Sequence, residues 1–308
     1  MRVVFAGSPA IAVPALEAVY AMPDVELVAV LTNPDSPKGR HGRSEPTDVG
    51  AAAGRLVVKE MLAETKFPIL KPQKLDAALR KALVALKPEL LVSFAYGHIF
   101  GPKFLALFPL GGINIHPSLL PRYRGATPIQ AAILHRDHET GLSIQRLARE
   151  MDSGDLLYQE RIPLSGRETT ESLSAFMAAK AVAALPKMLS AIAQGRVESY
   201  PQTGDVSYCA PITKDEGRID WTQSAEAIDA QIRAFTPWPL SWTLHGEQYL
   251  HFLEAAPYTE APYTEAPVGT VLGIDKRAGI LVQTGDGVLC VTRLQYRTRK
   301  ALEWRAFL

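Results

Sequence analysis

The segment Gly111–Gly125 reads GGINIHPSLLPRYRG and places two polar side chains at the end of a short apolar run. Asn114 and His116 are two residues apart, so both side chains point to the same face of an extended strand. The His-Pro-Ser turn ends the strand, and ligands bind at the carboxyl ends of strands in open α/β sheets. An amide donor beside an imidazole suits the handling of a carbonyl oxygen and a proton. Taken alone, such a pair is more often a turn cap and a histidine bonded to backbone.

Strand patterns alternate with helix patterns on both sides of this segment. The apolar runs that predict strands are Val3–Ala6, Val25–Leu31, Phe67–Leu70, Leu90–Phe94, Ile113–His116, Leu142–Leu147 and Leu156–Ile162. Helical patterns lie between them, from Pro9 to about Tyr20 and over Lys74–Leu86. This alternation predicts an α/β fold built on a mostly parallel sheet that is covered on both faces. A long Ala/Leu-rich helix over Glu168–Gln194 follows, with a kink or break expected at Pro186.

The first strand runs into the turn Gly7-Ser8-Pro9, a place where many α/β proteins bind nucleotides. The chain contains neither G-x-G-x-x-G nor G-x-x-x-x-G-K-[ST]. Those glycines let a phosphate approach the backbone, so the sheet is expected to be Rossmann-like without using NAD or ATP.

Composition and charge indicate a globular protein of one large or two ordinary domains. The chain has 308 residues, 47% of them hydrophobic and 21% charged, with a net charge of +1. This balance excludes a protein that coats nucleic acid through bulk positive charge, but it permits a local basic patch. The two cysteines, Cys209 and Cys290, are expected to be free thiols. No apolar run approaches a membrane span and no signal peptide is recognisable, so a cytoplasmic location is expected.

A polar connection follows the second predicted strand. Asn33–Arg43 reads NPDSPKGRHGR, and a helical stretch over Thr47–Lys66 comes next. Connections in α/β units usually take about 2–6 residues, so a longer loop is either functional or mobile. A solvated loop and a basic arm that contacts phosphates both remain open.

The pattern changes from about Ser199. Short β-like runs then dominate, and a helix is expected near Ala225–Ala234. Many short strands without long helices predict a small barrel or sandwich. The pentapeptide APYTE occurs twice in tandem, over Ala256–Glu265, and is expected to be a duplication in a surface loop.

The stretch near the end has more basic than acidic residues: Glu303 stands against Arg293, Arg297, Arg299, Lys300 and Arg305. Either a solvated face or a phosphate-contacting edge would explain this excess.

A carboxylate completes the candidate site. Met151–Asp155 reads MDSGD and lies between two predicted strands, where its loop can bring Asp152 near His116. A buried carboxylate beside an imidazole orients the ring and favours its protonated form. Asp155 is a second candidate, although it opens the next apolar run and is more suited to capping it.

Several motifs together resemble the folate-dependent formyltransferases. They are FAGSP at Phe5–Pro9, NIHPSLLPRYRGATPI at Asn114–Ile129 and MDSGD at Met151–Asp155. Two further segments, Tyr208–Trp221 and Ile232–Pro239, narrow the resemblance to the branch that acts on tRNA. The similarity is read from Arg2 to about Pro239 and weakens beyond it.

The resemblance implies a fold and a reaction. The fold would be a Rossmann-like catalytic domain over 1–198, a linker over 199–207 and an OB-like tRNA-binding barrel over 208–308. The formyl group of 10-formyltetrahydrofolate would pass to the α-amine of methionine on initiator tRNA. Neither a metal nor an obligate protein partner is implied, and no membrane is involved. Asn114 and His116 would stabilise the formyl oxygen, while Asp152 orients His116 and assists proton transfer.

The resemblance also implies binding residues. Those expected to contact the folate are Phe94, Tyr96, Gly97, Ser118, Leu119, Leu120 and Pro121. Those expected to contact tRNA are Lys38, Arg40, Arg43, Arg293, Arg297, Arg299 and Lys300. The basic loop holds fewer cations than the family pattern, because His41-Gly42-Arg43 stands where a glycine and two lysines are common.

Three alternatives remain. A formyltransferase acting on a nucleotide sugar or ribonucleotide would keep the three catalytic residues but would need no basic arm or second domain. A non-catalytic RNA-binding protein would have no reason to keep all three. A hydrolase that releases formate from the folate is disfavoured by the tRNA-type segments.

Overall fold

The computed structural model describes residues 1–38, 42–59, 67–260 and 265–307. The chain divides into two compact units. The first consists of Met1–Ala126, Thr140–Ile162 and Ser174–Tyr208, and the second of Thr127–Glu139, Pro163–Leu173 and Cys209–Leu308. Because these units interleave along the chain, the expected domain boundaries at 198 and 208 stay predictions.

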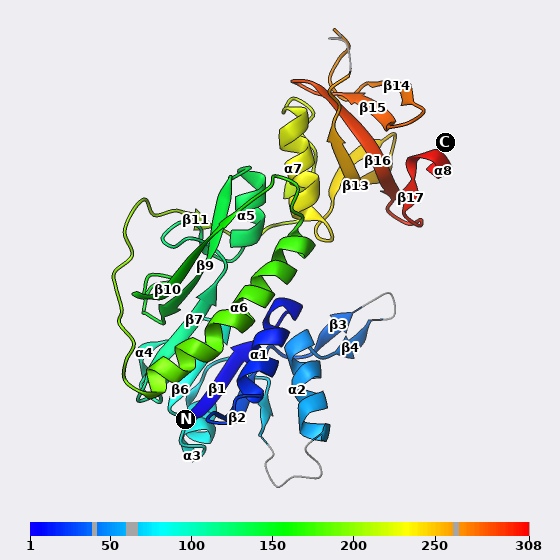
Figure 1. The fold of residues 1–308 in the computed structure, drawn as a ribbon. Coiled ribbons are helices and arrows are strands. Elements are labelled where there is room, and N and C mark those ends of the chain that lie inside the picture. The colour runs from blue at the N-terminus through cyan, green and yellow to red at the C-terminus, as the bar shows by residue number, and fades with distance from the viewer. Residues whose placement is uncertain (39–41, 60–66, 261–264, 308) are drawn as a thin grey trace. The chain divides into compact units, whose positions relative to one another are not determined.

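A seven-stranded sheet forms the centre of the first unit (Figure 1), in the order β10-β9-β7-β6-β1-β2-β5. Its strands are β1 (Arg2–Gly7), β2 (Glu26–Leu31), β5 (Ile69–Leu70), β6 (Leu90–Phe94), β7 (Gly112–His116), β9 (Glu139–Arg146) and β10 (Leu156–Pro163). The strands from β7 to β5 in this order pair in parallel, whereas β9 runs antiparallel to β7. The predicted mostly parallel α/β sheet is confirmed.

The strand order places the carboxyl ends of β1, β6 and β7 together. The chain first winds from β1 to β2 and β5, and then crosses to β6 on the other side of β1. This reversal is the topological switch point at which open α/β sheets bind ligands. The candidate residues of β7 therefore lie at the edge where a site is expected.

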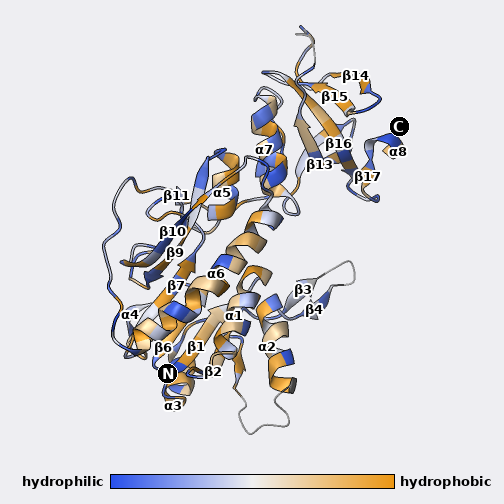
Figure 2. Ribbon diagram, in the orientation of Figure 1, coloured by the Kyte–Doolittle hydropathy of each residue, from blue (hydrophilic) through white to orange (hydrophobic). Residues whose placement is uncertain are grey.

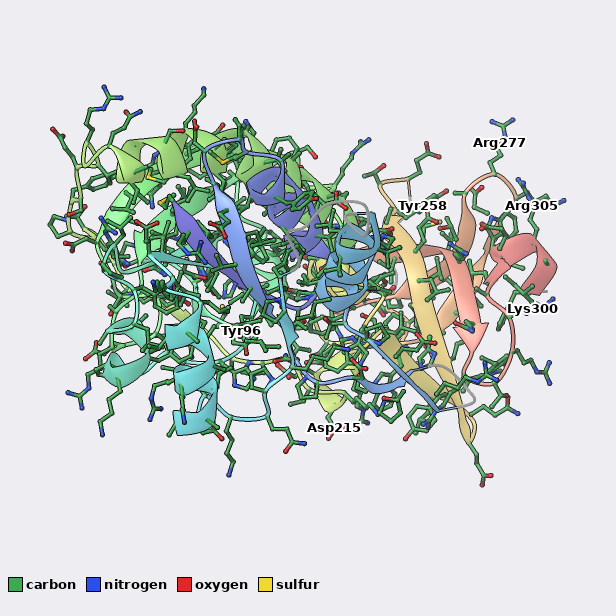
Figure 3. All side chains as sticks on the ribbon, turned by 90° about the horizontal axis from the view of Figure 1, so that it is seen from below. Tyr96, Asp215, Tyr258, Arg277, Lys300 and Arg305 are labelled. Atoms are coloured by element: carbon green, nitrogen blue, oxygen red, sulfur yellow. The ribbon has the colours of Figure 1, made fainter. Side chains whose placement is uncertain are left out.

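Helices cover both faces of this sheet. Figures 1 and 3 show α1 (Val13–Tyr20) and α6 (Thr170–Ala193) on one face, and α3 (Ala77–Ala85) and α4 (Pro102–Leu105) on the other. One core cluster joins α3, α4 and the segment after α4 to β1 and β2 through Leu79, Leu83, Phe104, Phe108, Val4, Ala6, Val28 and Leu31. Strand β1 is hydrophobic along most of its length (Figure 2). Burying one such large side chain stabilises the fold by about 1.5–3 kcal/mol.

Helix α6 runs unbroken through Pro186. Of the kink or break expected there, the break is therefore wrong, because packing along the helix outweighs one missing backbone hydrogen bond. The kink stays a prediction. By length and composition alone α6 could cross a membrane, unlike the expectation from the sequence. Its buried residues include Met177, Ala181, Leu185 and Leu189, which recur every four residues and are 0% exposed. This spacing is that of a helix packed by one face against a protein core.

Short elements account for most differences from the expected fold in the first unit. The polar connection contains β3 (Ser36–Lys38) and β4 (Arg43–Glu45), which pair as antiparallel strands. Whether this connection is solvated or contacts phosphates is not decided by the pairing. Helix α2 covers Asp48–Lys59, and the rest of the helix expected to Lys66 lies outside the described residues. The short elements α4 and β8 (Arg124–Gly125) have too few residues for a hydrophobic periodicity, so the sequence pattern does not predict them.

An antiparallel sheet forms the second unit, in the order β12-β13-β16-β15-β14. Its strands are β12 (Ser241–His245), β13 (Gln248–Pro257), β14 (Val271–Asp275), β15 (Gly279–Gln283) and β16 (Val288–Tyr296), with β17 (Leu302–Glu303) beside β16. Helix α7 (Ala225–Phe235) is apolar on one side and polar on the other (Figure 2). Its apolar side meets the sheet through Ile228, Ile232, Phe252 and Leu289. The helix and strands predicted for this region are confirmed. Closure of the sheet into a barrel stays a prediction.

The remaining short elements are η1 (Ala10–Ala12), β11 (Tyr208–Cys209), η3 (Asp215–Gly217), α5 (Pro128–Leu134) and α8 (Trp304–Phe307). The first APYTE copy does not lie wholly in a loop, since Ala256 and Pro257 belong to β13. Tyr258 donates its backbone N–H to Val288 and its hydroxyl to Asp275. Most of the second copy, 261–264, lies outside the described residues. Within the described part of the chain, neither Cys209 nor Cys290 forms a disulfide, as expected.

Candidate active site

Strand β7 delivers two of the predicted residues to the switch point. Ile113 and Ile115 face the core and are buried, so the alternate positions Asn114 and His116 share the opposite face. His116 is 4% exposed. Asn114 is half-buried and lies between Ser93 of β6 and Gln145 of β9 in the sheet register. The two side chains are therefore fixed by a central strand.

The turn after β7 is tied down by hydrogen bonds. Ser118 donates its hydroxyl to the carbonyl oxygen of Arg122, at 2.6 Å. Ser143 donates to the carbonyl oxygen of Ser118 and accepts from the backbone N–H of Leu120. A cis peptide bond joins Leu120 to Pro121. Ser118, Leu119, Leu120 and Pro121, predicted to border a folate, are all buried, so their clearest role in the structure is to hold this turn in place.

The loop between β9 and β10 carries Asp152 in a left-handed conformation, with φ of 52°. Gly154 packs on Arg146: a Cβ there would lie 1.9 Å from the carbonyl oxygen of Arg146. The backbone N–H of Arg146 in turn donates to the carbonyl oxygen of Asp155, at 2.8 Å. The loop is thus pressed against the end of β9, which aims the Asp152 side chain at β7.

The structure brings the three predicted catalytic residues together. The Asn114 Nδ2 atom donates to Asp152 Oδ1 at 3.2 Å, and His116 Nδ1 lies 3.5 Å from Asp152 Oδ2. The other ring nitrogen, His116 Nε2, lies 2.8 Å from the carbonyl oxygen of Tyr123. Because a carbonyl only accepts, Nε2 carries the hydrogen in this contact. Asp155, the second carboxylate considered, is exposed and lies outside the cluster.

Two further donors hold the Asp152 carboxylate. The backbone N–H of Gly125 donates to Oδ2 and Gln145 Nε2 donates to Oδ1, each at 2.8 Å. Gln145 itself meets Gln202, whose side-chain oxygen accepts from Arg124. Sequence reasoning missed Gln145, Gln202 and Arg124. Gln145 alone left a signal, as a polar residue in the apolar run that predicts β9.

The residues expected to bind the folate ring follow β6. The side chains of Phe94 and Tyr96 are buried, at 0% and 2% exposure, so Phe94 packs in the core. The residues on either side of Tyr96, Ala95 and Gly97, are exposed and have φ of 51° and 83°. Tyr96 lies inside the first unit (Figure 3), and its hydroxyl has no hydrogen-bond partner within the described part of the chain. Burial raises the pKa of Tyr96 to about 12. The folate contacts stay a prediction.

The residues expected to contact tRNA lie in two places. In the hairpin, Arg43 is exposed, Arg40 lies outside the described residues, and Lys38 belongs to β3. In the second unit, Arg297 lies over the ring of Tyr249 and Arg299 over that of Tyr296, at 5.1 and 5.7 Å from the centroids. Arg293 lies 3.8 Å from Glu303, and Lys300 is exposed. Figure 3 shows Arg277 and Arg305 at the surface of the same unit. These contacts also stay predictions.

A metal centre has no counterpart in the described parts of the chain, since no three His, Cys, Asp or Glu side chains gather there. The cluster at the switch point instead offers an amide donor, an imidazole and a carboxylate. An amide has two hydrogens, so Asn114 can donate to Asp152 and to a substrate oxygen at once. Such groups suit acyl transfer through a tetrahedral intermediate.

Two stretches of the chain match known protein families. Residues 1–189 match the formyl transferase family, and residues 211–308 match the C-terminal domain of formyl transferases. The fold and the site thus define a formyl transferase with its C-terminal domain.

Curated relatives identify the branch of the formyl transferases to which the chain belongs. The methionyl-tRNA formyltransferase of Treponema denticola is 48% identical over 100% of this chain and 96% of its own length. The corresponding enzyme of Pseudomonas fluorescens is 38% identical over 99% of this chain and 91% of its own. The chain belongs to the methionyl-tRNA formyltransferase family.

The match extends beyond Pro239 to the end of the chain. That the similarity is weaker there stays a prediction. Solved structures show the same fold at low identity. HypX from Aquifex aeolicus, in complex with tetrahydrofolic acid, is 16% identical with a TM-score of 0.64, over 100% of this chain and 47% of that one. WlaRD, a sugar 3N-formyl transferase, is 18% identical with a TM-score of 0.65, over 97% and 99% of the two chains.

Proposed function

We propose that this protein transfers the formyl group of 10-formyltetrahydrofolate to the α-amine of methionyl initiator tRNA, for translation initiation. The observation that carries the proposal is the cluster of Asn114, His116 and Asp152 at the switch point. Family membership over the full chain supports the acceptor. Because the acceptor is a tRNA, the reaction takes place in the cytoplasm.

The chemistry follows from the donors in the site. The amine nitrogen attacks the formyl carbon, and the electron pair of the carbonyl π bond moves to the formyl oxygen. Asn114 donates an amide hydrogen to that oxygen as its charge develops, and a fixed donor is most effective there because it needs no reorganisation. The bond from the carbon to the folate nitrogen then breaks, while the proton released by the amine passes to that nitrogen.

His116 and Asp152 serve the proton transfer. In the ligand-free geometry both nitrogens of His116 are directed at protein oxygens. His116 therefore reaches a substrate atom by exchanging one of these contacts, and hydrogen bonds of this kind commonly tighten only with substrate bound. Asp152 sets the ring orientation from Oδ2 while its other oxygen is held by Asn114 and Gln145.

The folate is proposed to bind against the exposed residues Ala95 and Gly97, next to the carboxyl end of β6. The buried hydroxyl of Tyr96, which has no partner among the described residues, fits a ligand that carries polar edges. For the tRNA, the exposed Arg43 and the arginines of the second unit supply positive charge for phosphates.

The test is incubation of the full-length protein with 10-formyltetrahydrofolate and either charged initiator tRNA or charged elongator methionine tRNA. Formyl-methionyl-tRNA is expected with the initiator and little with the elongator. Absence of formyl-methionine with both would reject the proposal. Formylation of an amino sugar nucleotide in its place would establish the alternative acceptor class.

A further inference from the structure

The segment that leads out of α6 contributes a side chain to the catalytic cluster. Gln202 lies in this segment and its Nε2 atom donates to the carbonyl oxygens of Asp152 and Gly154, each at 2.8 Å. The same atom lies 3.2 Å from Gln145 Oε1. An amide nitrogen has two hydrogens, so the two shorter contacts tie both ends of the Asp152 turn, and the longer contact with Gln145 shares one of these hydrogens.

Arg124 fixes the direction of these hydrogen bonds. Its Nε and Nη2 atoms donate to Gln202 Oε1, at 3.1 and 2.7 Å. A guanidinium has only donors, so the oxygen of Gln202 must face Arg124 and its NH₂ must face the loop. Gln145 then has to accept with its oxygen, which leaves its NH₂ to donate to Asp152 Oδ1 at 2.8 Å. Arg124 therefore fixes the orientation of the Gln202 amide, and the Gln145 amide is oriented by the Gln202 contact on one side and Asp152 Oδ1 on the other.

We propose that Arg124, Gln202 and Gln145 form a positioning chain that holds the Asp152 carboxylate in register with Asn114 and His116. This inference rests on the proposed function. None of the three is assigned a reacting atom, since they act through Asp152. The left-handed backbone of Asp152 costs free energy in a non-glycine residue, although Asp tolerates it better than most, so contacts that hold it stabilise the turn. Gln202 supplies that constraint from a segment distant in the sequence.

Breaking the positioning chain is expected to displace the Asp152 carboxylate without altering its chemistry. Gln202→Met keeps the side-chain length but removes the donor to two carbonyl oxygens and the acceptor for Arg124. A displacement of a reacting group by about 1 Å can cost about 100-fold in rate. We expect kcat for formyl transfer to fall about 10- to 100-fold, with the KM for 10-formyltetrahydrofolate changed by less than about threefold. Gln202→Glu, which keeps the acceptor for Arg124 but loses the donors, is expected to be as impaired.

The decisive measurement repeats the substitution in an Asp152→Asn background. If Gln202 acts through the carboxylate, Gln202→Met causes no further loss of kcat there, because interacting residues give non-additive effects. Arg124→Met is expected to show the same dependence on background. An equal fold loss in both backgrounds would mean that Gln202 merely supports the fold, and it would overturn the inference.

Gln231 provides a matched control. Its Nε2 atom also reaches three carbonyl oxygens, those of Glu216, Gly217 and Arg218, but in the second unit. Gln231→Met is expected to lower the melting temperature as Gln202→Met does, with kcat unchanged. A comparable loss of kcat in Gln231→Met would show that any broken amide network slows the enzyme, and would overturn the inference. If the unmodified protein forms no formyl-methionyl-tRNA, the proposed function itself fails. An active protein whose Gln202→Met variant keeps full kcat refutes only the positioning chain.

Discussion

At the scale of single residues, the site is decided by what surrounds Asp152. Its carboxylate accepts from Asn114, Gln145 and the backbone N–H of Gly125, while its second oxygen faces His116. A half-buried carboxylate with this many donors is held in one rotamer. His116 in turn is held from both sides, so its ring orientation is set before substrate binds.

Replacing His116 tests its place in the mechanism. We expect His116→Ala to lower kcat by about 100-fold or more, because a positioned acid–base group contributes about 10²- to 10⁴-fold. The measurement is single-turnover formyl transfer to charged initiator tRNA. His135 is a matched control, since its Nδ1 atom also contacts a backbone carbonyl at 2.8 Å. His135→Ala is expected to keep normal turnover. If His116→Ala also keeps normal turnover, His116 takes no part in the chemistry.

Tyr96 carries a buried hydroxyl without a partner among the described residues. An unsatisfied polar group of this kind costs about 1–3 kcal/mol. Tyr96→Phe is therefore expected to raise the free energy of unfolding of the ligand-free protein by about 1 kcal/mol. If the hydroxyl contacts the folate, the same change raises the KM for 10-formyltetrahydrofolate severalfold. A destabilised variant with unchanged KM would contradict both expectations.

The pH dependence of stability gives an independent check on Tyr96. Burial raises its pKa from 10.0 to about 12, so the folded state favours the neutral phenol. This contribution is complete below pH 10 and is lost as the pH rises through about 12. Urea unfolding between those values should show a steeper decline for the natural protein than for Tyr96→Phe. Parallel curves would mean that Tyr96 is not buried in solution.

At the scale of elements, the loop between β9 and β10 is built on one close approach. Gly154→Ala would place a Cβ 1.9 Å from the carbonyl oxygen of Arg146, so the loop must move. We expect the free energy of unfolding to fall by about 1–3 kcal/mol and kcat to fall at least about tenfold. Among the described residues, nothing beyond its own stretch of α2 lies within 4 Å of such a Cβ at Gly54. Gly54→Ala should stabilise the protein by about 0.5–1 kcal/mol with kcat unchanged. Equal turnover in both variants would argue against a role for loop position.

The sequence was informative where a period or a motif spans several residues. The strands β1, β6 and β7 were predicted within about one residue, because apolar runs between turns define buried strands. Asp152 could be placed near His116 from its position between two strands. The hydrogen bonds of Gln202 and Arg124 could not be predicted, since each depends on residues far apart in the chain. Pro186 misled for a similar reason, because tertiary packing decides whether a helix tolerates it.

At the scale of the whole molecule, charge is distributed unevenly. The net charge of the whole chain is +1, but the stretch from Arg293 to Arg305 in the second unit has an excess of cationic residues. Arg297 and Arg299 rest on Tyr249 and Tyr296, so the guanidinium groups are held near aromatic faces. Arginine beside an exposed ring suits both phosphates and unpaired bases. The reacting groups and these cations therefore lie in different units of the chain.

This separation predicts that affinity for tRNA and turnover can be changed independently. The double substitution of Arg297 and Arg299 by alanine should weaken tRNA binding. It should also reduce the slope of log K against log salt by about 0.9 for each phosphate that these two side chains neutralise. At saturating charged tRNA, kcat should stay within about twofold, because the Asp152 cluster is untouched.

Lys103→Ala on α4 is the control for this double substitution, because Lys103 is an exposed cation of the first unit. It should leave both the affinity for tRNA and the salt slope as they are in the natural protein. An unchanged salt slope in the double variant would mean that Arg297 and Arg299 form only a solvated face. A large fall in kcat at saturating tRNA would mean that the second unit takes part in the chemistry as well as in binding.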